Sequence, residues 1–276
     1  MVSVHNFSYG LLNPGLAFLM SCLGSFLGLR CVILSRAYHG AAKARWLILA
    51  AVSIGAVGIW AMHFIAMLGF TIPGEPIRYN VPITIGSLLI SVAVVTVGSF
   101  IVGFGNGGWP RLIGGGTVIG IGVAAMHYVG MAAMSMPGSM SYRLPLVALS
   151  VVIAIVAGTA SLWIGTWVRS IAATVGAAIV MGIAVTGMHY TGMAALQVKG
   201  GVMPSMGING VATVSGVSGA TAATFLIPLL LVISLATFLL TLSISMTPSE
   251  DEIRADAEML RRLNYLEQRG TPNPEG

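Results

Sequence analysis

Seven long apolar stretches constrain the fold of this chain more than any other feature. They lie near residues 11–35, 46–70, 81–104, 111–134, 144–168, 171–196 and 221–246. Each is long enough to cross a bilayer, which takes about 20 residues of helix. Strands of an open sheet would leave backbone N–H and C=O groups unpaired in lipid, so the stretches are expected to be helical. We therefore predict an all-α membrane protein with seven transmembrane helices.

The composition supports this class and excludes others. Only 8% of the residues are charged, whereas a soluble domain carries about 25%. The net charge of +5 is therefore expected to report membrane topology, and no nucleic-acid partner is predicted. Cys22 and Cys31 share one apolar stretch without a CxxC spacing, which predicts neither a disulfide framework nor a zinc site.

Lysine and arginine residues are distributed unevenly between the two sides of the predicted bundle. One side carries Arg36, Lys43, Arg45, Arg111, Arg169 and the tail residues Arg254, Arg261, Arg262 and Arg269, and the other carries Arg78, Arg143 and Lys199. Loops rich in Lys and Arg stay in the cytoplasm. We therefore predict a multi-pass protein of the bacterial inner membrane, with its N-terminus outside and its C-terminus in the cytoplasm.

One pattern, Met-His-aromatic-x-small-Met, occurs three times, at residues 62–67, 126–131 and 188–193. The histidines, His63, His127 and His189, are 64 (127 − 63) and 62 (189 − 127) residues apart. Such a period indicates internal duplication. The repeat is a pair of spans with the motif late in the second, so residues 1–246 form three parallel pairs plus a seventh helix. All three motifs are then expected in the outer leaflet.

Histidine and methionine at these spacings indicate a metal site. Residues four apart share a helix face, so each histidine neighbours the last methionine of its motif, while the first methionine lies about 100° around the helix. Imidazole and thioether ligands together favour a soft ion, Cu(I) first. The spans contain no Asp or Glu, the ligands that calcium and magnesium need. The predicted metal ligands are Met62, His63, Met67, Met126, His127, Met131, Met188, His189 and Met193.

The aromatic positions and the glycines refine this prediction. Tyr128 and Tyr190 follow their histidines and are candidates for orienting a cofactor or a bound gas, whereas Phe64 replaces tyrosine in the first copy. His127 and His189 are therefore expected to bind more strongly than His63. Glycines such as Gly120 in the spans that carry the motifs should let those helices approach closely. The alternative is that the histidines and methionines only pack the helices. Three copies in one leaflet favour a site.

The motif Met188-His189-Tyr190-Thr191 resembles the one that names the bacterial MHYT integral-membrane sensor domain, and the resemblance covers residues from about 10 to 246. It implies a seven-helix domain whose Met, His and Tyr residues bind copper near the outer face and through it sense oxygen, carbon monoxide or nitric oxide. Such domains often precede cytoplasmic diguanylate cyclase, cyclic-di-GMP phosphodiesterase, histidine kinase or DNA-binding modules. Phe64 and Ala66 depart from the pattern.

Residues 247–276 differ from the rest of the chain. Ser249 and Glu252 form a capping-box pattern, which predicts a short amphipathic helix in the cytoplasm that could couple the bundle to an output partner. We expect no enzymatic activity, because the sequence has no nucleophile–base pair, membrane carboxylate or phosphate-binding loop. Copper handling or transport is the alternative function. Haem held by His–Met pairs is a further alternative, and no CxxCH motif accompanies it.

Overall fold

The structure is a computed structural model that describes residues 7–72, 77–105, 108–136, 139–199, 219–245 and 258–262. Seven of its helical spans are long and apolar enough to cross a membrane, which confirms the predicted number and the all-α class. The second span begins at Gly40 rather than near residue 46. The elements are α1 (Leu12–Ser35), α2 (Gly40–Val52), η1 (Ser53–Ala61), α3 (Met62–Met67), β1 (Arg78–Tyr79), α4 (Val81–Gly103), α5 (Trp109–Ala132), β2 (Met134–Ser135), β3 (Ser139–Tyr142), α6 (Leu144–Trp167), α7 (Ile171–Ala195), β4 (Leu196–Lys199), β5 (Ala220–Thr221), η2 (Ala222–Leu226) and α8 (Ile227–Ser245).

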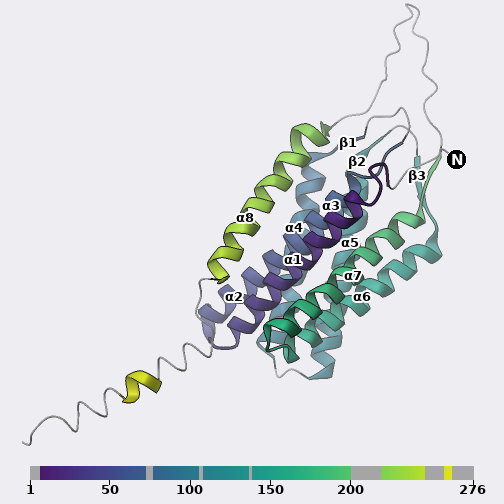
Figure 1. Ribbon diagram of the computed structural model, residues 1–276. Coiled ribbons are helices and arrows are strands. Elements are labelled where there is room, and N and C mark those ends of the chain that lie inside the picture. The colour runs from purple at the N-terminus through teal and green to yellow at the C-terminus, as the bar shows by residue number, and fades with distance from the viewer. Residues whose placement is uncertain are drawn as a thin grey trace, which may run out of the picture.

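Six spans form a closed ring, and the seventh lies outside it. The continuous span α2–η1–α3 packs against α1 and α4, α4 packs against α5, α5 against α6, α6 against α7, and α7 returns to α1. Helix α8 lies against α1 and η1 at the edge of the bundle (Figure 1). In each sequential pair the span that carries the motif is more buried than its partner. The three motif spans therefore face the interior, as three parallel repeats require.

The segment Ser53–Ala61 is a π-helix that ends one residue before the first motif begins. A π-helix widens the turn and is found mostly as short insertions near functional sites. Ser91 on α4 donates a hydrogen bond from its hydroxyl to the Gly55 carbonyl, 2.8 Å away, which satisfies one backbone group of this irregular segment. The second and third motifs lie on regular α-helices.

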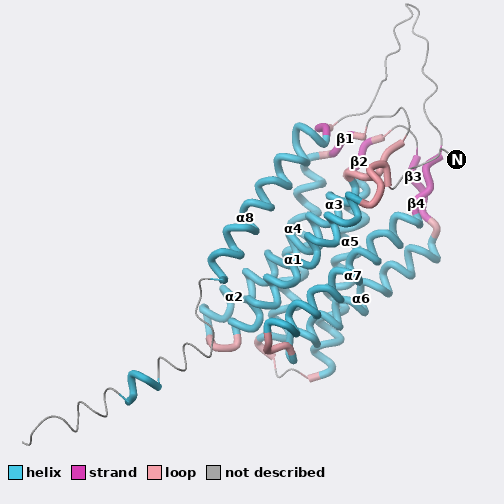
Figure 2. The backbone as a smooth tube through the Cα atoms, in the orientation of Figure 1, coloured by secondary structure: helices cyan, strands magenta, loops and turns pink. Residues whose placement is uncertain are grey.

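Short antiparallel strands lie beyond the motifs at one end of the bundle, where loops were expected (Figure 2). Strand β1 pairs with β2 and with β5, so Arg78 is opposite both Ser135 and Thr221. Strand β3 pairs with β4, with Ser139 opposite Lys199 at one end and Tyr142 opposite Leu196 at the other. These pairings join the ends of the three repeats. We call this the motif end, and the opposite end, which holds Arg36, Lys43, Arg111 and Arg169, the basic end.

Two backbone hydrogen bonds repeat the same link between neighbouring repeats. The Asn80 N–H bonds to the Ala133 carbonyl at 2.8 Å, and the Arg143 N–H bonds to the Ala195 carbonyl at 2.9 Å. Ala133 and Ala195 each lie six residues after a motif histidine. The first link therefore joins the end of α5 to the start of α4. The second joins the end of α7 to the start of α6. This arrangement holds the motif helices in a common register.

The glycines do not pack where the sequence suggested. A Cβ built on Gly120 would lie 2.3 Å from the Cα of Ile155 on α6, and one on Gly24 would lie 2.2 Å from the Gly58 backbone nitrogen. These glycines let each motif span approach a ring neighbour that carries no motif. The motif helices meet one another instead through the small residue inside the motif, as described below.

The predicted division at residue 246 and the tail helix stay predictions. Within 247–276 the structure describes only residues 258–262, which are helical. There Arg262 forms an ion pair with Glu258 at 3.1 Å. The capping-box residues Ser249 and Glu252 lie outside the described residues.

Candidate metal centre

The three motif histidines meet at one point inside the bundle. The Nδ1 atom of His63 lies 3.0 Å from Nδ1 of His189 and 3.1 Å from Nδ1 of His127. One ligand atom from each histidine lies within 4.8 Å of the others. The side chains are at most 1% exposed. Residues 126 positions apart in sequence therefore share one buried, nitrogen-lined centre.

The three rings are arranged with approximate threefold symmetry. Their centroids are 4.9, 5.0 and 5.1 Å apart, and their planes meet at 81°, 83° and 89°. This arrangement follows from the duplication, because each repeat supplies the same helix position. The Nδ1 of His63 lies within hydrogen-bonding distance of the Nδ1 atoms of both partners. The histidine of the first repeat thus lies as close to the centre as the other two, and its weaker binding stays a prediction.

The glycine of each later motif makes room for a histidine of another repeat. A Cβ on Gly130 of α5 would lie 2.6 Å from Nε2 of His63, and a Cβ on Gly192 of α7 would lie 2.3 Å from Nε2 of His127. Both distances are too short for any real side chain. Glycine at the small position of the pattern therefore leaves space for the imidazole of another repeat. The sequence shows only that this position lies three residues after the histidine, which did not reveal this role.

The hydrogen-bonding capacity of the three rings is not satisfied by the protein. Each Nδ1 has either one proton or one lone pair in the ring plane, so the central His63 can form a good hydrogen bond with only one of its two partners. Among the described residues, the Nε2 atoms of all three histidines are buried without a hydrogen-bond partner. Buried polar atoms usually have partners. Three converging lone pairs would be satisfied by one cation.

The spacing of the nitrogens fits such an ion. Imidazole binds metals at about 2.0–2.1 Å, which separates three nitrogens around one ion by roughly 3.4 Å. The observed separations of 3.0 and 3.1 Å are a few tenths of an ångström shorter. Metal-binding histidines usually donate their outer N–H to an acceptor, and here the described residues supply none. The nitrogen set therefore fits a small ion, with a less polar surrounding shell than is usual.

All six predicted methionine ligands are buried. Each lies within four residues of a motif histidine in the sequence. Met67, Met131 and Met193 belong to the main apolar core, together with Met126 and Met188. Met62 packs in a separate small cluster with Ala17 and Ala66. Burial makes these residues available both as packing groups and as sulfur ligands, so their role as ligands stays a prediction.

The two motif tyrosines are placed differently. The Ser150 hydroxyl donates to the Val147 carbonyl, so the Tyr128 hydroxyl donates to the Ser150 oxygen, 2.7 Å away. Among the described residues, the buried Tyr190 hydroxyl has no partner, and its ring stacks on Phe7 at 5.4 Å. Tyr190 is therefore better placed than Tyr128 to orient a ligand, and its role stays a prediction.

Phe64 takes the tyrosine position of the first motif and is part of the core. It is fully buried, 4.7 Å from the Trp60 ring and 6.2 Å from the Tyr79 ring between centroids. Tyr79 lies in strand β1, where burial raises its pKa to about 12. At the same end, burial and the neighbouring Tyr128 raise the pKa of Tyr142. Both strand tyrosines are therefore neutral at ordinary pH.

An apolar cavity of about 30 Å³ lies deeper in the bundle, on the side of the histidines toward the basic end. Its walls include Ile59, Val123 and Met188, and Met188 directly precedes His189. A water molecule needs about 10–15 Å³ of such space. The cavity is therefore large enough for a very small apolar molecule next to a motif.

Comparison with known proteins places the chain in a family. The repeat described as "Bacterial signalling protein N terminal repeat" and named MHYT matches residues 57–115 and 120–178. Each match begins shortly before a motif histidine and extends through the next helix, which gives the same period as the motifs. No solved structure matches the chain.

Several signalling proteins are similar to most of this chain. It is 37% identical over 195 residues to the bifunctional diguanylate cyclase/cyclic di-GMP phosphodiesterase MucR of Pseudomonas aeruginosa, covering 69% of this chain and 28% of that protein. It is 36% identical to the cyclic di-GMP phosphodiesterase NbdA of the same organism, covering 70% and 25%. It is 31% identical to the signaling protein YkoW of Bacillus subtilis, covering 65% and 23%.

The chain thus spans about a quarter of the length of these relatives. The catalytic activities that the names of MucR and NbdA state belong to those whole proteins. The two matched repeats contain the first two motifs and begin 63 (120 − 57) residues apart, close to the period of the motifs. This chain therefore belongs to the MHYT family of bacterial membrane signalling proteins.

Proposed function

We propose that the three motifs form one copper site, and that the bundle senses a diatomic gas at this site and passes the signal to a cytoplasmic partner. The observation that carries the proposal is the convergence of three buried Nδ1 atoms at 3.0 and 3.1 Å without enough hydrogen-bond partners. His63, His127 and His189 would hold the ion. Met67, Met131 and Met193 are the nearest sulfur candidates by helix position.

The donor set favours copper over other ions. Neutral imidazoles and thioethers suit Cu(I), whereas hard cations need carboxylate or carbonyl oxygens. Reduced copper supplies a site to which oxygen, carbon monoxide or nitric oxide can bind. The chain's own residues exclude water, since the histidines are at most 1% exposed, and the 30 Å³ apolar cavity offers room for a diatomic molecule beside Met188.

The packing of the rings favours an ion over haem. The imidazoles touch edge to face, with centroids 4.9–5.1 Å apart, and their outer edges rest on Gly130 and Gly192. A porphyrin would have to separate these rings and displace the helices. An ion needs only small movements of the rings.

The signal would require two arrangements of the motif helices with different affinity for the gas. The π-helix directly precedes the first motif, and we place the rearrangement there. The outside N-terminus and cytoplasmic C-terminus belong to the same proposal, supported by the Lys and Arg residues gathered at the basic end. Residues 247–276 are the proposed route to the output partner.

Metal analysis of the purified protein tests the proposal. The expected result is one copper per chain, because three repeats share one centre. Single substitutions His63→Ala, His127→Ala and His189→Ala should each abolish tight binding, since each removes one of three ligands. Retention of two coppers, or full binding in any single variant, would contradict a shared site. Absorbance spectra of the same samples distinguish haem, which would show a Soret band. Cu(I) uptake into vesicles would instead favour copper transport.

A further inference from the structure

A second cavity, of about 210 Å³, opens at the basic end of the bundle. Its walls come from five of the spans, and include Leu29 of α1, Ile54 of η1, Val95 of α4, Ile119 of α5 and Leu162 of α6. Ile119 is ten residues into α5, so the cavity reaches roughly 15 Å from that end along the axis. It is therefore a long apolar pocket, separate from the histidines.

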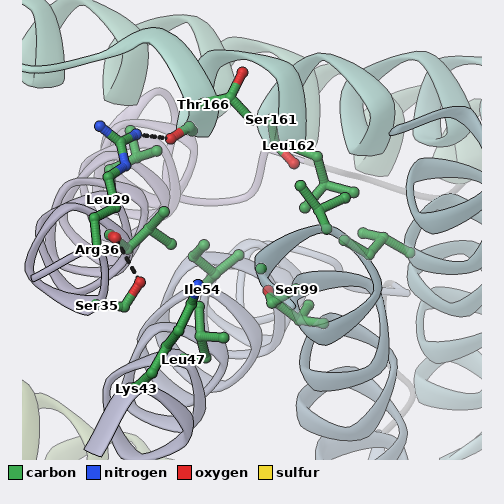
Figure 3. Close-up of a pocket in the computed structure, with 16 residues that line it drawn as sticks. Leu29, Ser35, Arg36, Lys43, Leu47, Ile54, Ser99, Ser161, Leu162 and Thr166 are labelled. Atoms are coloured by element: carbon green, nitrogen blue, oxygen red, sulfur yellow. Dashed lines mark hydrogen bonds between the residues drawn. The ribbon is translucent and has the colours of Figure 1, made fainter. Parts of the chain in front are cut away.

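The mouth of this cavity is positively charged. Lys43 and Arg36 both line it, and no lining residue is acidic. The Arg36 guanidinium donates hydrogen bonds to the carbonyls of Gly165 and Val168. The Lys43 ammonium lies 5.4 Å above the centre of the Phe104 ring, and it has no carboxylate partner within the described ranges. Figure 3 shows its side chain extending from α2 toward the cavity.

One hydroxyl in the cavity differs from the others. Ser35, Ser161 and Thr166 each donate to a carbonyl of their own helix. Ser99 is only 6% exposed and lines the cavity, yet no hydrogen-bond partner for it occurs in the part of the chain that the structure describes. The Ser99 hydroxyl is thus a donor in the cavity lining that is not bonded to its own helix.

We infer that this cavity binds an amphiphilic anion, a carboxylate or phosphate group on an apolar chain. Lys43 and Ser99 would bind the headgroup, with Arg36 at the rim, and the apolar walls toward Ile54 and Ile119 would hold the chain. Two positive charges without an acidic residue in the lining disfavour a metal cation. The length and apolarity of the pocket disfavour a small inorganic anion. The inference does not depend on copper.

The test uses the full chain in phosphatidylcholine nanodiscs, kept metal-free with a chelator. Dodecanoate is titrated, and bound ligand is counted by native mass spectrometry. Dodecanol serves as the uncharged probe and inorganic phosphate as the probe without a chain. We expect dodecanoate to bind at one site per chain, and neither of the other probes to compete with it.

Two conservative variants locate the site. Lys43→Met keeps the apolar stem and removes the charge, and Ser99→Ala removes only the hydroxyl. Each should weaken dodecanoate binding by about tenfold, since a hydrogen bond to a charged group is lost. Arg45→Met, an exposed cation outside the cavity, and Ser161→Ala, whose hydroxyl is already bonded to its own helix, are the matched controls and should bind normally. Thermal unfolding confirms that all four variants are folded.

The results separate the possible sources of the ligand. Competition by phosphatidylglycerol in the nanodisc would assign the site to a membrane lipid, and selective binding of dodecanoate would assign it to a free acid. Either outcome supports an amphiphilic anion. Wild-type binding in both Lys43→Met and Ser99→Ala, or binding of dodecanol as tight as that of dodecanoate, would overturn the inference.

Discussion

Replacement of Gly192 by alanine is the sharpest test of the shared histidine centre. The added methyl would lie 2.3 Å from Nε2 of His127. Ordinary van der Waals contact requires about 3.5 Å, so the imidazole or helix α7 must move by roughly 1 Å. The fully buried ring has no free space on the side of His63, whose Nδ1 is 3.1 Å from its own. The His127 nitrogen should therefore leave the shared centre.

The effects on binding and on stability should differ in size. Displaced metal ligands typically weaken affinity by about 10–100-fold even when the change lies outside the ligands themselves, and we expect a loss in this range. Overpacking costs about 1–3 kcal/mol, and alanine in a helix recovers about 0.5–1 kcal/mol of that relative to glycine. The protein should thus remain folded in detergent while its copper affinity falls.

The assay is a Cu(I) competition titration with a chelator of known affinity, performed beside thermal unfolding. Gly187→Ala is the matched control, because it lies on the same helix and its Cβ would meet nothing within 4 Å. It should bind copper normally. Gly130→Ala should behave like Gly192→Ala, since its methyl would lie 2.6 Å from Nε2 of His63. Normal affinity in Gly192→Ala would refute the geometry on which the copper proposal rests.

Three further results are expected. Reporter fusions should place the N-terminus outside and the C-terminus in the cytoplasm, because the Lys and Arg residues gather at the basic end; a cytoplasmic N-terminus would reverse the placement of the histidine centre. The double change Met131→Leu and Met193→Leu keeps the volume and apolarity of the side chains, so it should lower the free energy of unfolding by less than about 1.5 kcal/mol per site. It should still weaken Cu(I) binding, because the sulfurs are lost. An unchanged Cu(I) affinity would assign these sulfurs to packing alone. Ser150→Ala removes the acceptor of the Tyr128 hydroxyl and should lower the free energy of unfolding by about 1 kcal/mol without changing copper affinity. A loss of copper comparable to that in the histidine variants would place this hydroxyl pair in the site.

The duplicated sequence was sufficient to predict which histidines lie together but not the geometry in which they meet. The period of the motif implied equivalent helix positions, and equivalent positions in a ring of parallel pairs converge. The sequence also led us to rank His63 below the others, since Phe64 and Ala66 depart from the pattern. That ranking stays a prediction. The structure shows that the Nδ1 of His63 lies within 3.1 Å of both partners, because the side chain at the histidine position, and not its neighbours, reaches the axis.

The glycines show a similar limit of the sequence. Their abundance indicated close helix contacts but not the contacting helix. In the structure Gly120 packs against α6, while Gly130 and Gly192 seat the imidazoles of other repeats. Which face of a helix meets which neighbour depends on the rotation of each helix about its axis, and that rotation is set by packing of the whole ring.

The sequence alone determined the class of the fold, since apolar length and the scarcity of charge leave helices across a bilayer as the available solution. It also determined the number of repeats and which histidines lie at equivalent positions, whereas the predicted ligand atoms stay a prediction. Tertiary structure decided what depends on contacts between distant segments: the strands that link the repeats, the π-helix before His63, and the cavity that joins Lys43 to Ser99. These features satisfy backbone and side-chain groups across helices, and no local pattern of residues specifies such partners.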